Sequence, residues 1–182
     1  MKILYGEKIS LAFLYKEWYN NKKRRGRTMT RAEKAKELFE KGYACSQAVA
    51  MAFADEVGVD VSTLEKITLP FGGGFGRLRL TCGAVSGMAA IYGLAAPNLG
   101  SLPENKKAVY AGTRELAARF EKGNGSIVCA ELLASKNFPV VVGGETESGD
   151  GLSVKKRTCA ELVYNAAEIL ENYLKEQGLL KN

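Results

Sequence analysis

The chain has 182 residues, a length typical of one domain that can bury a hydrophobic core without disulfides or a structural metal. Hydrophobic residues make up 46% of the sequence and charged residues 25%, as in ordinary globular proteins. Histidine is absent, which excludes nucleophiles activated by histidine, histidine general bases and zinc sites that contain histidine.

The formal net charge of +6 is concentrated at the amino terminus. Residues 1–28 contain eight basic and two acidic side chains, so residues 29–182 contain 18 of each and are neutral. A neutral body argues against nucleic-acid binding as its main function. We expect residues 1–28 to be a basic leader, either an upstream extension of a chain that natively starts at Met29 or a flexible arm for an anionic membrane surface.

Residues 29–182 are expected to form a single helical domain with four cysteines. No stretch approaches the roughly 18–20 apolar residues that span a bilayer, so no transmembrane segment is predicted. The short apolar run that begins at Leu11 is not a convincing secretory signal, because Lys16 and Glu17 follow it directly. We therefore expect a cytoplasmic protein whose thiols are reduced at rest.

Apolar side chains recur with the 3.6-residue period of helices, and no strand–helix–strand alternation is visible. The pattern predicts an all-α fold, a compact bundle of about six to seven helices with a glycine-rich loop before the central cysteine helix. Thr30 with Glu33 predicts a capping box at the start of the first helix. Helices are expected near 30–41, 44–57, 61–69, 82–94, 104–121, after Ser126, and 158–176.

The tetrapeptide Cys-Ala-Glu-Leu occurs twice, at 129–132 and at 159–162. Each copy follows a residue that can cap a helix, Ser126 in one case and Thr158 in the other, and Thr158 with Glu161 fits a capping box. We infer similar local geometry at the start of two helices, and no structural repeat.

The stretch from Thr81 to Ala90 reads Thr-Cys-Gly-Ala-Val-Ser-Gly-Met-Ala-Ala. In a helix, Gly83 and Gly87 lie on one face and let another backbone approach closely. Cys82 then lies at the first turn, where unpaired N–H groups and the helix dipole favour negative charge. We therefore predict that Cys82 is the most thiolate-like cysteine, in the form that attacks disulfides and binds metals.

All four cysteines are predicted within the first turn or so of a helix, on its apolar side. If these helix ends meet, the thiols converge on one site, which would be catalytic or would ligate a metal. Single ligands from separate helices fit an iron–sulfur cluster or another thiolate-bound metal centre better than zinc, whose cysteines usually come in close pairs. They also fit thiol–disulfide pairs, whereas the simplest alternative is four small core side chains. The four are Cys45, Cys82, Cys129 and Cys159.

The glycine run before Cys82 matches neither a P-loop nor a dinucleotide-binding fingerprint. It would form either a tight turn between helices or a backbone nest whose N–H groups approach an anionic cluster or ligand. Arg77 and Arg79 would add positive charge to such a nest. The candidate cofactor-binding positions are Gly72, Gly73, Gly74, Gly83 and Gly87.

Taken in order, these motifs resemble the C_GCAxxG_C_C family of small redox-active proteins, over roughly residues 30–175. The resemblance implies that the four cysteines are the functional set, that redox chemistry or metal-cluster binding is their role, and that the gene is associated with transporters. The motifs that carry it are Gly-Tyr-Ala-Cys45-Ser-Gln-Ala, Phe71-Gly72-Gly73-Gly74, Cys82-Gly83-Ala84-x-x-Gly87, Cys129-x-Glu131-Leu132 and Cys159.

We therefore predict a small redox-active protein whose four cysteines share one site, with a redox protein or a membrane transporter as partner. The site either binds an iron–sulfur or other metal centre or works through thiol–disulfide pairs. Whether the protein is a thiol- or cluster-dependent oxidoreductase stays open. The alternative is a non-catalytic helical module that binds a membrane transporter and whose cysteines only pack in the core.

Overall fold

The computed structural model describes residues 29–138, 140–143 and 150–180, and the side chains of residues 150–157 are not among those described. The predicted leader, residues 1–28, lies outside this part of the chain. The described residues form eight α-helices, a short 3-10 helix and no strand, so the all-α prediction is confirmed. The helices are α2 (Arg31–Glu40), α3 (Cys45–Ala52), α4 (Ala54–Val57), α5 (Val61–Thr68), η1 (Leu69–Phe71), α6 (Gly83–Ala95), α7 (Leu102–Asn124), α8 (Cys129–Ala134) and α9 (Asp150–Glu176).

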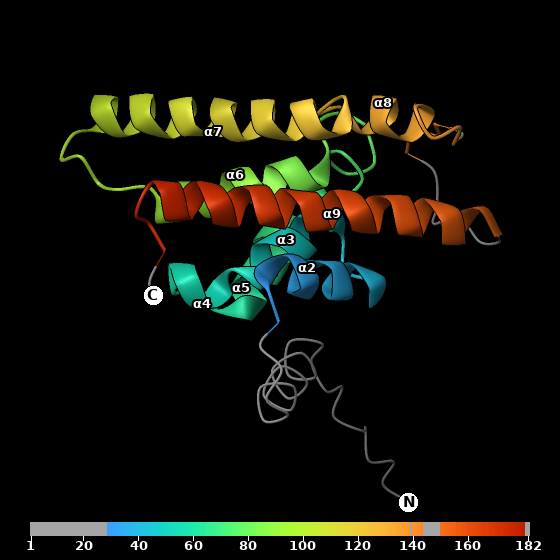
Figure 1. Cartoon of the computed structure of the whole chain (residues 1–182), viewed down its shortest axis with the longest axis horizontal. Helices are drawn as coiled ribbons and strands as arrows, with labels where there is room; N and C mark the ends of the chain where they lie inside the picture. Colours follow the sequence, from blue (N-terminus) through green and yellow to red (C-terminus); the bar gives the residue numbers. More distant parts are fainter. Residues whose placement is uncertain (1–28, 139, 144–149, 181–182) are drawn as a thin grey trace, which may run out of the picture.

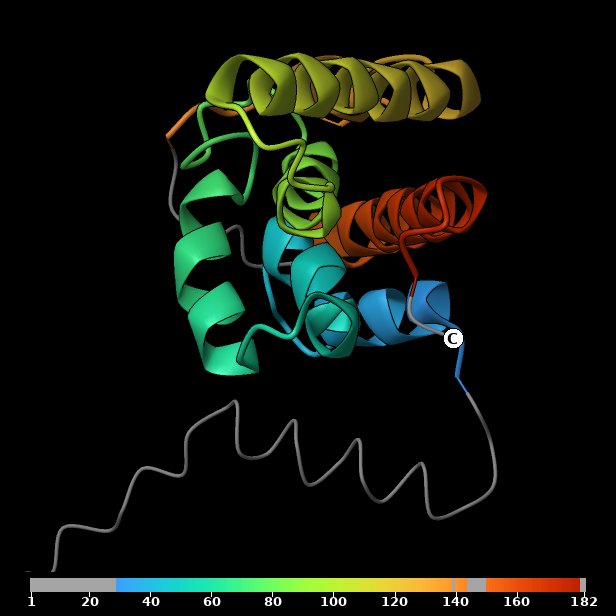
Figure 2. The ribbon, with the colours of Figure 1, turned by 90° about the vertical axis from the view of Figure 1, so that its left-hand side faces the viewer.

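The helices pack in layers around α6 (Figures 1 and 2). The long helix α7 covers one side, α6 lies between α7, α9 and α3, and α2 packs against α3 and α9 on the opposite side. Large side chains at the centre are fully buried, among them Phe53, Met88 and Leu170. None of the described helices is both long and apolar enough to cross a membrane.

Local capping signals fixed the start of α2 as predicted. The Thr30 hydroxyl accepts the Glu33 N–H at 3.1 Å, and the Glu33 carboxylate accepts the Thr30 N–H at 3.0 Å. This reciprocal pair satisfies two N–H groups that have no partner within the helix. The capping-box prediction at Thr30 is confirmed.

Two predicted helices differ from the observed ones. The helix expected over 44–57 is interrupted at Phe53, so that α3 and α4 are separate, and Gly58 ends α4 with a left-handed φ of 64°. The helix expected to start at Thr158 already starts at Asp150: Gly151 lies in its first turn, and no glycine or proline interrupts residues 152–157. The prediction of a capping box at Thr158 is therefore wrong, since Thr158 lies inside α9.

Gly83 and Gly87 lie where α6 crosses α3. A Cβ atom added to Gly87 would lie 2.8 Å from the Ser46 carbonyl oxygen and 3.0 Å from Val49 Cβ. A Cβ atom added to Gly83 would collide with Cys45 Sγ. The prediction that these two glycines permit close backbone approach is confirmed.

This crossing predicts opposite effects for two identical substitutions on α6. We expect Gly87→Ala to lower the free energy of unfolding by about 1–3 kcal/mol, because the added methyl group overpacks the contact with α3. Gly93→Ala is the matched control, since Gly93 is exposed and an added Cβ meets no atom within 4 Å. It should be neutral or stabilising by up to about 1 kcal/mol. Urea unfolding measures both variants, and equal effects would contradict a close crossing.

Candidate functional site

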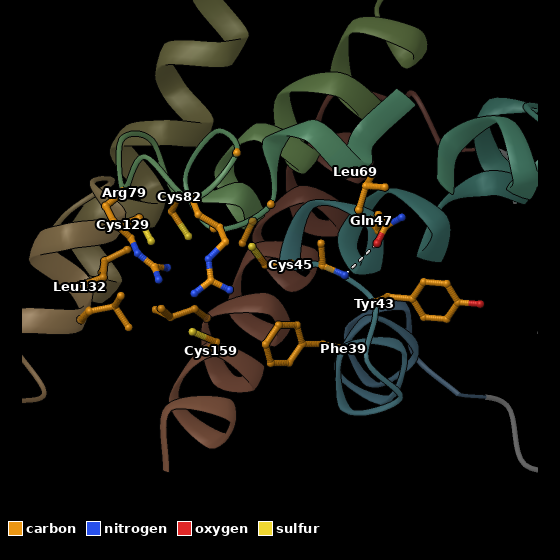
Figure 3. A pocket seen from close by; sticks show the side chains of 18 of the residues that line it. Phe39, Tyr43, Cys45, Gln47, Leu69, Arg79, Cys82, Cys129, Leu132 and Cys159 are labelled. Atoms are coloured by element: carbon orange, nitrogen blue, oxygen red, sulfur yellow. Dashed lines mark hydrogen bonds between the residues drawn. The ribbon is translucent and has the colours of Figure 1, made fainter. Parts of the chain in front are cut away.

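The four cysteines line one cavity of about 730 Å³. Figure 3 shows their sulfur atoms facing the same space from four separate parts of the fold. Cys82 is 5% exposed and Cys129 is 9% exposed, whereas Cys45 and Cys159 are half-buried. The structure thus brings together all four cysteines that the sequence singles out.

A short backbone pairing places Cys82 beside Cys129. Residues Thr81 and Val128 form an isolated antiparallel bridge. The Cys82 N–H donates to the Ile127 carbonyl at 2.8 Å, and the Cys129 N–H donates to the Leu80 carbonyl at 2.7 Å. Cys82 is the N-cap residue of α6 and Cys129 is the first residue of α8, so this pairing holds two helix starts together at the cavity.

Cys45 is the first residue of α3 and lies between the glycine-rich loop and the start of α6. Its sulfur contacts Gly83, the residue that follows Cys82. The backbone of Gly73 lies near the Cys45 sulfur and acts to lower the pKa of this thiol. Cys45 therefore lies against both glycine features of the sequence, the loop that contains Gly73 and the helix motif that contains Gly83.

Cys159 reaches the cavity in a different way from the one predicted. It is the tenth residue of α9 and lies in the middle of that helix, so its predicted position at a helix start is wrong. Its thiol lines the cavity together with Leu162, one turn further along α9. Cys129 and Leu132 of α8 line the cavity with the same spacing. In both copies of the tetrapeptide, the cysteine and the leucine thus face the cavity, but only the copy at Cys129 lies at a helix start.

The glycine-rich loop makes a left-handed turn at the edge of the cavity. Residues Gly73 to Arg77 all have positive φ angles, between 58° and 74°, and Arg79 follows with φ 63°. Residues other than glycine rarely adopt this backbone conformation, because it costs them roughly 1–2 kcal/mol each. Phe75, Arg77 and Arg79 all adopt it. Such backbone strain tends to occur where the surrounding structure and the function require a particular direction of the chain.

The predicted glycine positions are distributed unevenly around the cavity. Gly72 and Gly73 line it, and Gly74 packs behind it, where an added Cβ would lie 2.7 Å from Cys129 Cβ. Gly83 and Gly87 serve the crossing of α6 and α3. The tight turn is therefore observed, and a role of these glycines in holding a cofactor stays a prediction.

Burial controls the ionisation of the two cysteines at the centre of the site. Burial raises the pKa of the Cys45 thiol, although the backbone hydrogen bond from Gly73 opposes this. Burial also raises the pKa of the Cys82 thiol well above its usual range, and the neighbouring thiol of Cys45 raises it further, more than those of Cys129 and Cys159. The prediction that Cys82 is thiolate-like is wrong, because desolvation outweighs the hydrogen bond from the Ala84 N–H at the helix start.

The arrangement does not fit a single metal ion. In the described part of the chain, no group of three or more Cys, Asp and Glu side chains is placed so that it could hold one. All four cysteines lie in that part, and no disulfide joins them. A [4Fe–4S] cluster differs, because each of its four irons takes one cysteine and the four sulfurs need not meet at one ion.

The cavity has residues that sequence patterns did not assign to it, among them Tyr43, Gln47 and Leu133. Gln47 acts locally: its side-chain oxygen accepts the Ala44 N–H at 2.8 Å, and its amide group donates to the Glu65 carbonyl at 2.8 Å. Leu133 belongs to a helical pattern that is equally typical of an ordinary core position. Tyr43 and Gln47 stand in the motif around Cys45, which was the available signal, whereas nothing in the sequence distinguishes Leu133 from a core residue.

The raised pKa of Cys82 predicts an unusual pH dependence of its alkylation. In the reduced protein at pH 7 we expect Cys82 to react with iodoacetamide more slowly than a small-molecule thiol, because the raised pKa lowers the fraction of thiolate. Its rate should still be rising well above about pH 8.5, where an ordinary thiol is half ionised. Peptide mass spectrometry over a pH series measures this, with the protein unfolded in guanidinium as control. A plateau below about pH 8.5 would restore the thiolate hypothesis.

Comparison with known proteins identifies the family. The family model described as "Putative redox-active protein (C_GCAxxG_C_C)" matches residues 43–173, which include all four cysteines of the cavity. No curated protein and no solved structure matches the chain. The family match covers well over half of the sequence and agrees with the order of motifs around the cavity. The chain belongs to the C_GCAxxG_C_C family.

Proposed function

We propose that the four cysteines act as one redox centre and that its working form is a dithiol–disulfide pair inside the cavity. The observation that carries the proposal is that thiols from four separate elements line a single cavity. Their membership of the functional motif of a redox-active family supports it. Reduced thiols that meet in one cavity are suited to exchange with a disulfide that enters it.

Cys45 and Cys82 are the pair that the contacts favour. Among the three neighbouring thiols, Cys45 has the largest electrostatic effect on the Cys82 thiol. The Cys45 sulfur also contacts Gly83, the next residue after Cys82. Cys45 is the more exposed of the two and is therefore the thiol that meets a substrate, while Cys82 resolves the intermediate.

The exchange transfers two electrons in two steps. The Cys45 thiolate attacks one sulfur of a substrate disulfide, the substrate S–S bond breaks, and one substrate thiol leaves with a proton. The Cys82 thiolate then attacks the Cys45 sulfur of the mixed disulfide, and the second substrate thiol leaves with a proton. Two electrons pass from the two cysteines to the substrate, which becomes two thiols, and a Cys45–Cys82 disulfide remains.

The direction of transfer follows from the charge state of the thiols. Strongly oxidising dithiol proteins stabilise their reduced form as a thiolate. Here burial raises the pKa of both Cys45 and Cys82, so the reduced form gains no such stabilisation near neutral pH. This argues against a strongly oxidising pair, and we propose that the pair acts as a reductant of its substrate.

Redox titration tests the proposal. We expect the protein, equilibrated with mixtures of reduced and oxidised dithiothreitol, to undergo a two-electron transition that peptide mapping assigns to a Cys45–Cys82 disulfide. Cys45→Ser and Cys82→Ser should each abolish the transition. Cys159→Ser is the control that should retain it, because Cys159 has the weakest effect on Cys82. Four cysteines that stay reduced, or that oxidise without preference, would contradict the proposal.

An iron–sulfur cluster is the second candidate form of the same centre. Four cysteines are the usual ligands of such a cluster, and two arginines with no acidic residue line this cavity within the described chain. The four thiolates would hold the cluster, which would supply one-electron chemistry, and the arginines would offset its negative charge. Anaerobic purification followed by a visible spectrum and iron and sulfide analysis separates the two forms. A colourless, iron-free protein would rule out the cluster and leave the dithiol form.

The non-catalytic alternative receives no support from the site. Cysteines that only packed in the core would not all need to line one cavity, as these four do. We propose a disulfide-bearing molecule as the redox partner. The transporter association, the cytoplasmic location and the division at Met29 stay predictions.

A further inference from the structure

The cavity contains a buried positive charge that no carboxylate among the described residues neutralises. Arg79 is 5% exposed and lines the cavity. Its Nε–H donates to the Val141 carbonyl at 2.9 Å. Its Nη2 atom is buried and has no hydrogen-bond partner among the described residues. A guanidinium group that is desolvated and not fully hydrogen-bonded is costly, so its presence requires an explanation.

Other arginines of the protein show what a partnered guanidinium looks like in this fold. Arg31 forms ion pairs with Glu56 and, at 3.1 Å, with Glu171. Arg119 pairs with Glu115 at 2.7 Å and with Glu176 at 2.8 Å. Arg79 is more buried than either of them, yet it has no ion pair with a carboxylate in the described part of the chain.

The direction of the Arg79 side chain is built into the backbone. Arg79 follows the left-handed turn and itself has a φ of 63°. Its N–H donates to the Gly73 carbonyl at 3.3 Å, and its carbonyl accepts the Ala130 N–H at 3.0 Å. These bonds hold it between the loop and α8, and Figure 3 shows its side chain extending into the cavity next to Cys129. The position is therefore fixed from both sides by main-chain contacts.

Among the described residues, the rest of the cavity lining carries no negative charge. Arg77 lines the same cavity, and no acidic residue does among the described residues. The remaining walls are mainly apolar side chains and the four thiols. In such a low-dielectric space, an anion that accepts a hydrogen bond from a guanidinium is bound strongly.

We propose that Arg79 forms an anion-binding subsite in the four-cysteine cavity, and that the molecule on which the thiols act is small and carries a carboxylate or another oxyanion group. A cavity of about 730 Å³ has the size of pockets that bind small molecules. The anionic group binds Arg79 Nη2, which places the rest of the molecule against the cysteines. The assignment of the substrate charge rests on the proposed redox function, whereas the anion subsite itself does not.

Alkylation of the reduced protein tests the subsite without any redox step. Iodoacetate and iodoacetamide deliver nearly the same group to a thiol but differ in charge. The measured quantity is the rate with iodoacetate divided by the rate with iodoacetamide. We expect this ratio to be about tenfold higher for the cavity thiols than for a small-molecule thiol, because one charge-assisted hydrogen bond contributes about that factor. A change in thiol pKa alters both rates equally and cancels in this ratio.

Arg79→Met should abolish the preference for iodoacetate, and Arg79→Lys should retain part of it. Arg114→Met is the matched control, because Arg114 is exposed on α7 and does not line the cavity. If Arg79→Met does not fold, competition by sulfate is the test on the wild-type protein. Sulfate should slow the reaction with iodoacetate until the effect saturates, whereas chloride at equal ionic strength should not. A preference that survives Arg79→Met, equal normalised rates for both reagents, or a lack of saturation by sulfate would overturn the subsite.

A charge series of small disulfides separates this inference from the proposed function. The reduced protein should reduce dithiodipropionate faster than 2-hydroxyethyl disulfide, and cystamine most slowly. Reduction of all three at similar rates would support the redox centre and overturn the anionic substrate. A preference for iodoacetate without reduction of any disulfide would support the subsite and overturn the dithiol function.

Discussion

The site depends on the close approach of α6 to α3. Gly83 and Gly87 remove the side chains that would hold the two helices apart, and the Cys45 sulfur and the Ser46 backbone occupy the space that is left. Because Cys82 immediately precedes Gly83, this packing sets the position of two cysteines at once. A larger residue at Gly83 would collide with the sulfur itself, so helix packing and thiol placement cannot be varied separately at this position.

The other two cysteines reach the same cavity by contacts of different strength. Cys129 is tied to Cys82 through two backbone hydrogen bonds and one isolated bridge between residues 80–82 and 127–129. Cys159 lies on the long helix α9, which packs against α2, α3, α6 and α7. The crossing of α3 and α6 thus holds Cys45 near Cys82, and the short backbone pairing holds Cys129 near Cys82. Cys159 is placed by the long helix α9.

Features set by neighbouring residues could be predicted from the sequence, and features set by the whole fold could not. The capping box at Thr30 and the four-residue spacing of Gly83 and Gly87 are local, and both predictions are confirmed. The position of Cys159 was mispredicted because the chain before it reads as a loop, although it continues a helix. The charge state of Cys82 was mispredicted for a deeper reason. The effect of a helix start is visible in the sequence, whereas desolvation depends on residues that only the fold brings together.

The left-handed turn before Cys82 has a consequence for how this protein can change. Phe75, Arg77 and Arg79 occupy a backbone region that favours glycine, and Arg79 also carries a desolvated charge. Each of these features lowers the stability of the domain, and neither contributes to the packing of the core. Substitutions that remove them are therefore routes to a more stable protein. If Arg79 forms the proposed anion subsite, such substitutions would raise the stability of the domain and weaken anion binding together.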